Sequence, residues 1–252
     1  MGATPTALLV ALAAPPDLPV GWARELAQGL AAECARTGAS VIGGDTARAD
    51  SVLLAVTGLG DLGGRAPVLR SGAAPGDLVA VAGPLGHAAA GLALLTAGVS
   101  TGPLVTAQRR PAPPYAAGPE AAALGATAMI DVSDGLLADL GHVADASGVQ
   151  IRLDPSALVP EEGLTAAARD LSERTGSMSR PASPLTPADV ARGWVLTGGE
   201  DHSLVATFPA GTALPSRWRV IGAVAAADPH PGVVVDGQPM TSGGLGWDHF
   251  AS

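Results

Sequence analysis

Short apolar segments of strand length alternate along this chain with longer segments of helical periodicity. Residues 6–13 and 51–60 are apolar runs that predict strands, and residues 20–38 between them predict a helix. The alternation continues with a predicted strand at residues 78–84 and a predicted helix at residues 86–98. Strands that alternate with helices favour an α/β or α+β fold.

Two further segments predict strands beside Gly-Gly turns. Residues 40–45 (SVIGGD) predict a short strand that ends in a Gly-Gly turn and an acid. Residues 194–209 predict two strands around the turn at residues 198–199. Near the end of the chain, Asp236 and Gly237 separate apolar residues and predict a hairpin turn.

A stretch rich in Gly, Pro and Arg interrupts the alternation at residues 60–77. We therefore predict a domain boundary near residue 62, with one domain over residues 1–62 and a second over residues 63–252. A total of 252 residues is compatible with one large or two modest domains.

Composition and local motifs exclude several classes of function. The formal net charge is −9 and no basic stripe is visible, which disfavours nucleic-acid binding. The chain contains no lysine, which excludes a Schiff-base lysine and a Walker A loop. GLGDLG at residues 58–63 matches a dinucleotide-binding fingerprint, but prolines follow where that motif requires a helix. A single cysteine, Cys34, and the lack of a membrane-length apolar run predict a soluble cytoplasmic protein.

The stretch AMIDVSDGLLADLGH, residues 128–142, concentrates acids where a predicted strand turns into a helix. Asp131 and Asp134 are three residues apart, so their carboxylates can approach one point, and clustered carboxylates are preferred ligands of Mg²⁺. Ser133 adds a hydroxyl, and the helix start offers free N–H groups to a phosphate. Capping of the helix by Ser133 or Asp134 explains the same residues equally well from their spacing.

Two other acidic clusters lie beside Gly-Gly pairs, at residues 43–45 and at residues 198–201. Three such clusters favour metal ligation over three independent caps, although acidic tight turns remain an alternative. Arg70 is a candidate phosphate ligand or an ordinary surface arginine. Trp247, in a Gly-rich segment, is either a core residue or a stacking platform for a flat ring.

Five segments in this order resemble the thiamine-monophosphate kinase family, a branch of the aminoimidazole ribonucleotide synthetase superfamily. They are IGGDTAR, GRAPVLRSGAAPGD, IDVSDGLLADLGH, LTGGEDH and GWDHF. The resemblance covers the whole chain. It implies the two-domain α/β (α+β) fold of that superfamily, and ATP-dependent phosphorylation of thiamine phosphate to thiamine diphosphate assisted by several Mg²⁺ ions.

The resemblance also implies roles for individual residues. Asp45, Asp131 and Asp134 would bind metal. Gly44, Asp45, Arg70 and Ser133 would contact ATP. Glu200 and Trp247 would contact the thiamine moiety, with Trp247 at a position where the family often has tyrosine. Phosphoryl transfer needs positioning and charge neutralisation more than covalent chemistry, so no covalent catalytic residue is expected.

The family's N-terminal stretch, which holds Gly-Asp-Asp and Ser-Thr-Asp motifs, a substrate-binding histidine and another metal-binding aspartate, has no counterpart here. We therefore expect a truncated N-terminal domain whose first strand (residues 6–13) is an exposed sheet edge. We also expect a homodimer in the full-length form. Two alternatives stay open: an inactive, non-catalytic Mg-ATP-binding remnant, or another ATP-using member of the superfamily.

Overall fold

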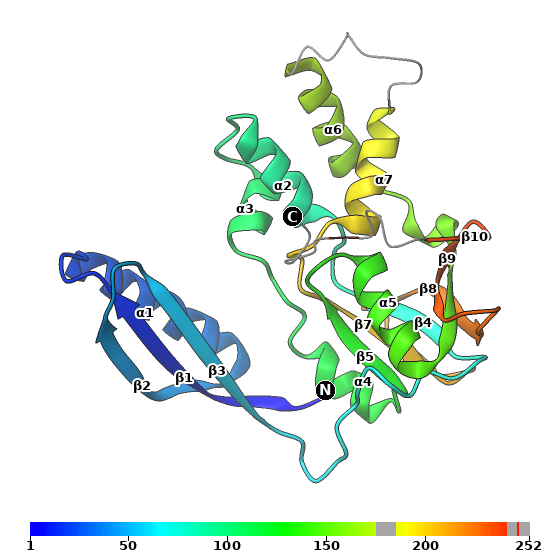
Figure 1. Ribbon diagram of the computed structural model, residues 1–252, viewed down its shortest axis with the longest axis horizontal. Coiled ribbons are helices and arrows are strands. Elements are labelled where there is room, and N and C mark those ends of the chain that lie inside the picture. The colour runs from blue at the N-terminus through cyan, green and yellow to red at the C-terminus, as the bar shows by residue number, and fades with distance from the viewer. Residues whose placement is uncertain (175–184, 241–245, 247–252) are drawn as a thin grey trace. The chain divides into compact units, whose positions relative to one another are not determined.

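A computed structural model describes residues 1–174, 185–240 and 246. The chain divides into two compact units, one of residues 2–67 and one of Met1 with residues 68–252, and each is treated separately below. The smaller unit contains four elements, coloured blue in Figure 1: β1 (Thr4–Ala14), α1 (Val20–Thr37), β2 (Ser40–Arg48) and β3 (Leu53–Asp61).

The smaller unit is a three-stranded sheet of order β2-β1-β3. Strand β1 pairs in parallel with β2 and antiparallel with β3, so the prediction that the first strand is a sheet edge is wrong. The prediction that β2 ends at its Gly-Gly pair is also wrong, because pairing continues from Ser40 to Arg48. Gly44 makes this continuation possible: it has φ 154°, and a Cβ there would lie 1.7 Å from the Val10 carbonyl oxygen.

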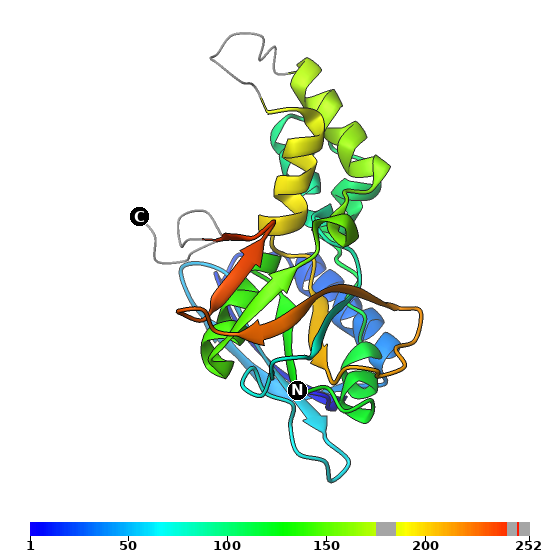
Figure 2. The same ribbon diagram turned by 90° about the vertical axis from the view of Figure 1, so that its right-hand side faces the viewer.

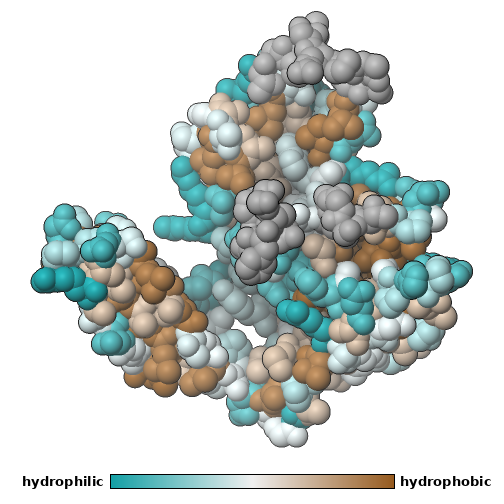
Figure 3. All heavy atoms as spheres, in the orientation of Figure 1, coloured by the Kyte–Doolittle hydropathy of each residue, from teal (hydrophilic) through white to brown (hydrophobic). Residues whose placement is uncertain are grey.

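Much of the apolar surface of this sheet is exposed. Every residue of β2 and β3 is exposed, although β3 is rich in Leu and Val and β2 contains Val41 and Ile42. Helix α1 ends at Gly38 in the left-handed conformation, as predicted, and buries the free thiol Cys34. Hydrophobic side chains are visible over the unit in Figure 3. The exposed large hydrophobic side chains of this unit are Leu9, Val20, Trp22, Val41, Ile42, Val52, Leu53, Leu54, Val56 and Leu59.

The larger unit is built on a seven-stranded mixed sheet of order β10-β9-β6-β8-β4-β7-β5. All neighbours are antiparallel except the parallel pair β6 and β9. The strands are β4 (Leu78–Ala82), β5 (Ala128–Val132), β6 (Val149–Leu153), β7 (Ser203–Phe208), β8 (Trp218–Ala226), β9 (Gly232–Val235) and β10 (Gln238–Pro239).

Helices complete the larger unit. Helix α5 packs against β5, β6 and β9, whereas α2, α3, α6 and α7 contact one another in a group beyond one end of the sheet (Figures 1 and 2). The main core lies between the sheet and α5 and contains Leu136, Leu140, Ile151 and Ile221. The helices are α2 (His87–Thr96), α3 (Pro103–Arg109), α4 (Ala117–Ala123), α5 (Leu136–Ser147), α6 (Glu162–Arg174), α7 (Pro187–Thr197) and a 3-10 turn, η1 (Pro155–Leu158).

The structure corrects one predicted strand and confirms two other predictions. Residues 194–197 are the last turn of α7, because a capping box between Thr186 and Asp189 starts the helix and Ala191 and Val195 bury one face. The hairpin at Asp236 and Gly237 is present, with positive φ at both residues. No helix follows GLGDLG within residues 62–77, as expected for a false fingerprint. Among the described helices, none has the length and apolarity needed to cross a membrane.

Candidate active site

The predicted acidic turn lies between β5 and α5. Asp131 is near the end of β5 with an exposed side chain, and Ser133 and Asp134 follow in the turn. We call residues 133–135 the SDG turn. Gly135 is the N-cap of α5 and has φ 129°, and a Cβ there would lie 2.6 Å from the Thr197 carbonyl oxygen. The glycine therefore lets the turn approach the end of α7 closely.

The N–H groups of the SDG turn have an internal partner. Asp139 Oδ2 accepts hydrogen bonds from the N–H groups of Ser133 (3.0 Å), Asp134 (3.1 Å) and Gly135 (3.1 Å). These three N–H groups are therefore not open to a phosphate, and the predicted phosphate contact at the helix start does not extend to them. The capping alternative is wrong, because the N-cap residue is Gly135 and α5 has no side-chain cap. Burial raises the pKa of the Asp139 carboxyl, and the turn's N–H donors oppose that rise.

The GGED loop (residues 198–201) lies against the SDG turn. The Glu200 N–H donates to the Ser133 carbonyl at 2.9 Å, and the His202 N–H donates to the Val132 carbonyl at 3.0 Å. A Cβ on Gly199 would lie 2.3 Å from the Ser133 carbonyl oxygen, so only glycine permits this approach. The loop precedes β7 and does not end a strand, contrary to the prediction. Two acidic motifs separated by about 65 residues thus form one surface.

His202 lies between two carboxylates of this surface. It was not predicted as a site residue, because no histidine in the sequence has the spacing of metal ligands. Its Nδ1 is 3.7 Å from Asp131 Oδ2, and its Nε2 is 3.7 Å from Glu200 Oε2. The contact with His202 lowers the pKa of Asp131, and the contact with Asp131 raises the pKa of His202. Glu200 (φ 68°) and His202 (φ 52°) are left-handed, a backbone strain found at functional sites.

Arg70 lies near Asp131 on a segment that extends the edge of β5. The Met129 N–H donates to the Leu69 carbonyl at 3.0 Å. Ser147, at the end of α5, fixes the segment: its hydroxyl donates to the Arg70 carbonyl at 3.0 Å and accepts from the N–H groups of residues 72 and 73. A cavity of about 510 Å³ is lined in part by Arg70 and Asp131. The charge of Arg70 contributes to the low pKa of Asp131, after the larger effect of His202.

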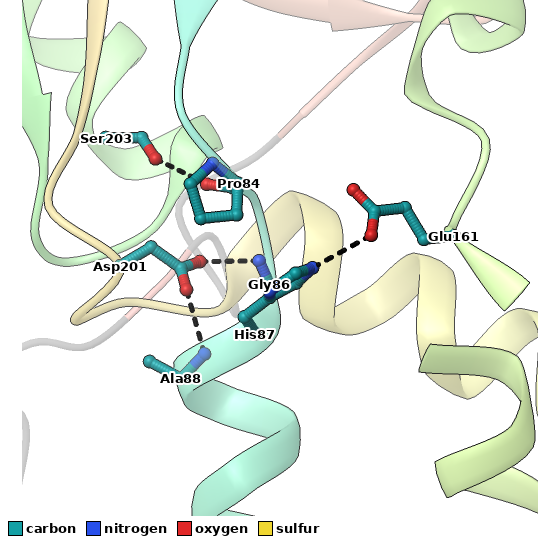
Figure 4. A network of polar contacts seen from close by, with 7 residues as sticks. All are labelled: Pro84, Gly86, His87, Ala88, Glu161, Asp201 and Ser203. Atoms are coloured by element: carbon teal, nitrogen blue, oxygen red, sulfur yellow. Dashed lines mark hydrogen bonds and ion pairs between the residues drawn. The ribbon is translucent and has the colours of Figure 1, made fainter. Parts of the chain in front are cut away.

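Asp201, the last acid of the GGED loop, has a structural role that was not predicted from the sequence (Figure 4). The buried carboxylate of Asp201 accepts hydrogen bonds from the N–H groups of Gly86 (2.5 Å) and Ala88 (2.8 Å) at the start of α2. Ser203 donates from its hydroxyl to the Pro84 carbonyl, and His87 contacts Glu161 at 3.2 Å. Burial raises the pKa of Asp201, against these N–H donors. The network fixes the loop that carries Glu200.

The remaining predicted residues are not placed at this surface by the structure. Gly44 and Asp45 belong to the smaller unit, where Asp45 accepts a hydrogen bond from the N–H of Thr46 at 2.8 Å. Trp247 lies outside the described residues. Gly246 beside it is described, and a Cβ there would lie 2.3 Å from the Asp134 carbonyl oxygen. Gly246 therefore lies directly against the backbone of the SDG turn.

The acidic side chains of the larger unit fit a metal site in which a bound substrate supplies the remaining ligands. Within the described part of the chain, no three His, Cys, Asp or Glu side chains cluster closely enough to hold a metal ion. Asp131, near the end of β5, and Asp134, in the SDG turn, carry the kind of side chain with which Mg²⁺ is commonly bound together with substrate phosphates. Neither carboxylate caps α5, because Asp139 meets the N–H groups of the turn.

Two family models match the chain. AIR synthase related protein, N-terminal domain, matches residues 1–62, and AIR synthase related protein, C-terminal domain, matches residues 74–178. The fold and its acidic site therefore define a protein of the AIR synthase-related class, and the predicted fold class is confirmed.

Individual relatives narrow the assignment. Thiamine-monophosphate kinase of Mycobacterium tuberculosis H37Rv is 46% identical over 99% of this chain and 69% of its own length. The crystal structure of thiamine monophosphate kinase from Aquifex aeolicus has a TM-score of 0.77 and 28% identity, over 95% of this chain and 76% of that one. A structure of AaThiL complexed with AMPPCP and TMP has a TM-score of 0.75 and 28% identity, over 99% and 75%. The chain belongs to the thiamine-monophosphate kinase family and is an enzyme of the phosphotransferase class.

Proposed function

We propose that the protein transfers the γ-phosphoryl group of ATP to thiamine phosphate and forms thiamine diphosphate and ADP. A phosphate oxygen of thiamine phosphate attacks the γ-phosphorus, and the bond from that phosphorus to the β,γ-bridging oxygen breaks. The relative with AMPPCP and TMP bound supports this pair of substrates. Transfer of this kind depends mainly on positioning and charge stabilisation, which matches a surface that offers carboxylates, an arginine and a serine hydroxyl.

The observation that carries the proposal is the direct joining of the SDG turn to the GGED loop. The Glu200 N–H bonds to the Ser133 carbonyl, and this contact brings acids expected to bind metal beside an acid expected to bind substrate. Arg70 lies beside the same strand, so a polyanion held there meets positive charge. A donor phosphate and an acceptor phosphate need this combination of ligands.

Each proposed site residue has a distinct task. Asp131 and Asp134 would hold Mg²⁺, which when bound neutralises negative charge on the phosphates. Arg70 and Ser133 would orient ATP, and Glu200 would orient the thiamine moiety. For Gly44, Asp45 and Trp247, the ATP, metal and substrate roles rest on the family resemblance alone, and participation of several metal ions rests on it too.

We also infer a homodimer formed through the smaller unit, in the cytoplasm. Support for the dimer comes from the exposed apolar side chains of β2 and β3, since large apolar patches mark interaction surfaces. The single free cysteine suits a reducing compartment. Sedimentation equilibrium should report twice the chain mass, and a monomer across the accessible concentration range would contradict the dimer.

The activity is tested with purified residues 1–252, ATP, Mg²⁺ and thiamine phosphate. We expect one thiamine diphosphate, measured as its fluorescent oxidation product, for each ADP released. A folded chain that binds Mg-ATP but forms neither product would contradict the proposal and favour the non-catalytic alternative. ADP release without thiamine diphosphate would point to another ATP-using reaction.

A further inference from the structure

Asp139 is an acid on the buried face of a core helix. Its side chain lies on α5 at the spacing of Leu136 and Val143, both of which belong to the main core, and the residue is 2% exposed. A charged carboxylate at such a position is costly unless hydrogen bonds compensate its lost hydration. Its presence therefore requires a specific set of partners.

Those partners are three consecutive N–H groups of the SDG turn. They converge on one oxygen, Oδ2, at 3.0 to 3.1 Å. Successive N–H groups that point to one centre form a concave anion site, which in many phosphate-binding proteins receives the ligand. Here a side chain of the protein itself occupies that centre.

We propose that Asp139 is a positioning residue, the internal anion that fixes the SDG turn and thereby holds the carboxylate of Asp134 in place for metal binding beside the end of β5, where Asp131 lies. Without this anion, three N–H donors of the turn would lose their common acceptor, and the turn would be held only by its backbone contacts with the GGED loop and α5. The Ser133 carbonyl, which receives the Glu200 N–H, belongs to the same turn, so Asp139 also supports the link to the GGED loop. The effect on catalysis rests on the function proposed above.

A consequence concerns phosphate recognition. Because Asp139 fills the anion site, substrate phosphates cannot use the N–H groups of residues 133–135. Their recognition falls to side chains such as Arg70 and to bound cations. The turn therefore contributes to cation binding and does not bind a substrate anion through its N–H groups.

The proposal is tested with Asp139→Asn, which keeps the shape of the side chain but removes its charge and half its accepting capacity. Asp145→Asn is the matched control, an exposed acid on the same helix. With Mn²⁺ as a paramagnetic replacement for Mg²⁺, we expect Asp139→Asn to weaken binding about tenfold or more. We expect kcat to fall at least tenfold, with the KM for thiamine phosphate within about twofold of the wild type, a pattern that marks lost transition-state stabilisation.

The control should match the wild type in Mn²⁺ affinity and kcat. A merely structural role for Asp139 would lower the melting temperature and leave both quantities unchanged in the folded variant, and that result would overturn the proposal. A wild-type chain that binds no Mn²⁺ would overturn it as well. A wild-type chain that binds Mn²⁺ without kinase activity would defeat the proposed function alone, and the Mn²⁺ comparison would still decide the role of Asp139.

A second measurement needs no variant, in case Asp139→Asn fails to fold. Amide hydrogen exchange on the wild type should show that the N–H groups of Ser133, Asp134 and Gly135 are protected as strongly as those of α5. Exchange at the rate of an unprotected loop would overturn the proposal.

Discussion

The Glu200 N–H donates to the Ser133 carbonyl at 2.9 Å, and this hydrogen bond joins two loops that lie far apart in the sequence. One loop follows β5 and the other precedes β7, and these two strands are antiparallel neighbours at the edge of the sheet. The pairing places the end of one strand beside the beginning of the other. The site is thus a direct product of sheet topology.

Gly199 is the residue that permits this contact, so Gly199→Ala should separate the loops. The added Cβ would lie 2.3 Å from the Ser133 carbonyl oxygen, and the backbone must move to accommodate it. We expect kcat to fall more than about tenfold and stability to fall by about 1–3 kcal/mol, as for other overpacked sites. Steady-state kinetics and urea unfolding measure the two effects.

Gly141→Ala is the matched control for that prediction. Gly141 lies in α5 with no atom within 4 Å of a built Cβ. Alanine there should leave activity unchanged and stabilise the helix by about 0.5–1 kcal/mol. If both glycine variants behave alike, close packing of Gly199 against Ser133 is not what shapes the site.

Asp201 should contribute to stability through the N-terminus of α2. Asp201→Ala leaves the N–H groups of Gly86 and Ala88 without their acceptor, at a cost of about 3 kcal/mol. Asp145→Ala, on an exposed surface, should change stability by less than about 0.5 kcal/mol. Urea unfolding of the wild type, Asp201→Ala and Asp145→Ala measures these changes in stability. Equal midpoints for the three proteins would contradict the assigned role of Asp201.

The same carboxyl should make stability depend on pH. Burial raises the pKa of Asp201 above its ordinary value of 3.8, against opposing effects of the Ala88 and Gly86 N–H groups and of the nearby His87. A raised pKa means that the folded state holds the proton more tightly, so this contribution is fully present below pH 3.8 and is lost as pH rises through the folded pKa. The charge of Asp201 also helps to raise the pKa of His202, the next residue in the chain, after the larger effects of Asp131 and Glu200.

Relative to Asp201→Asn, the wild type should therefore lose unfolding free energy as pH rises from the acidic range toward neutrality. Parallel urea titrations of the two proteins measure that difference at each pH. A difference that stays constant with pH, or grows in favour of the wild type, would contradict the raised pKa.

Ser147 should affect ATP through Arg70. Its hydroxyl bonds to the Arg70 carbonyl and accepts two N–H groups of the same segment, so Ser147→Ala frees that segment. We expect the KM for ATP to rise about threefold to tenfold, equivalent to about 1 kcal/mol for lost hydrogen bonds, with kcat nearly unchanged. Ser172→Ala removes a hydroxyl that bonds only within α6 and should leave the KM for ATP as it is. An unchanged KM for ATP in both variants would contradict the role of Ser147 in positioning Arg70 for ATP.

Local sequence patterns predicted the elements better than their connections. The strand before Asp131 and the helix after Gly135 were recognisable, because an apolar run gives way there to a 3.6-residue period. Residues 194–197 were mistaken for a strand, because a short apolar run does not distinguish strand from helix. The capping box of Thr186 and Asp189, at the other end of the same helix, is the signal that could have identified residues 194–197 as helical.

The site residues could be proposed from the sequence, but their partners could not. Nothing near Glu200 in the sequence indicates that its N–H bonds to Ser133, since that contact depends on the pairing of β5 with β7. The position of His202 between Asp131 and Glu200 depends on the same strand pairing and could not be predicted either. Asp139 did carry a signal, an acid at an apolar position of an otherwise regular helical pattern, which predicts a buried and hydrogen-bonded carboxylate.

The central claim is that the carboxylate of Asp131, at the end of β5, serves phosphoryl transfer to thiamine phosphate. The most direct measurement is the rate of thiamine diphosphate formation by Asp131→Asn and by the control Asp145→Asn, with unchanged circular dichroism confirming the fold. We predict a loss of about 10²-fold or more in kcat for Asp131→Asn, the size expected for one charge-stabilising group, and wild-type turnover for Asp145→Asn. Turnover of Asp131→Asn within twofold of the wild type would contradict the claim.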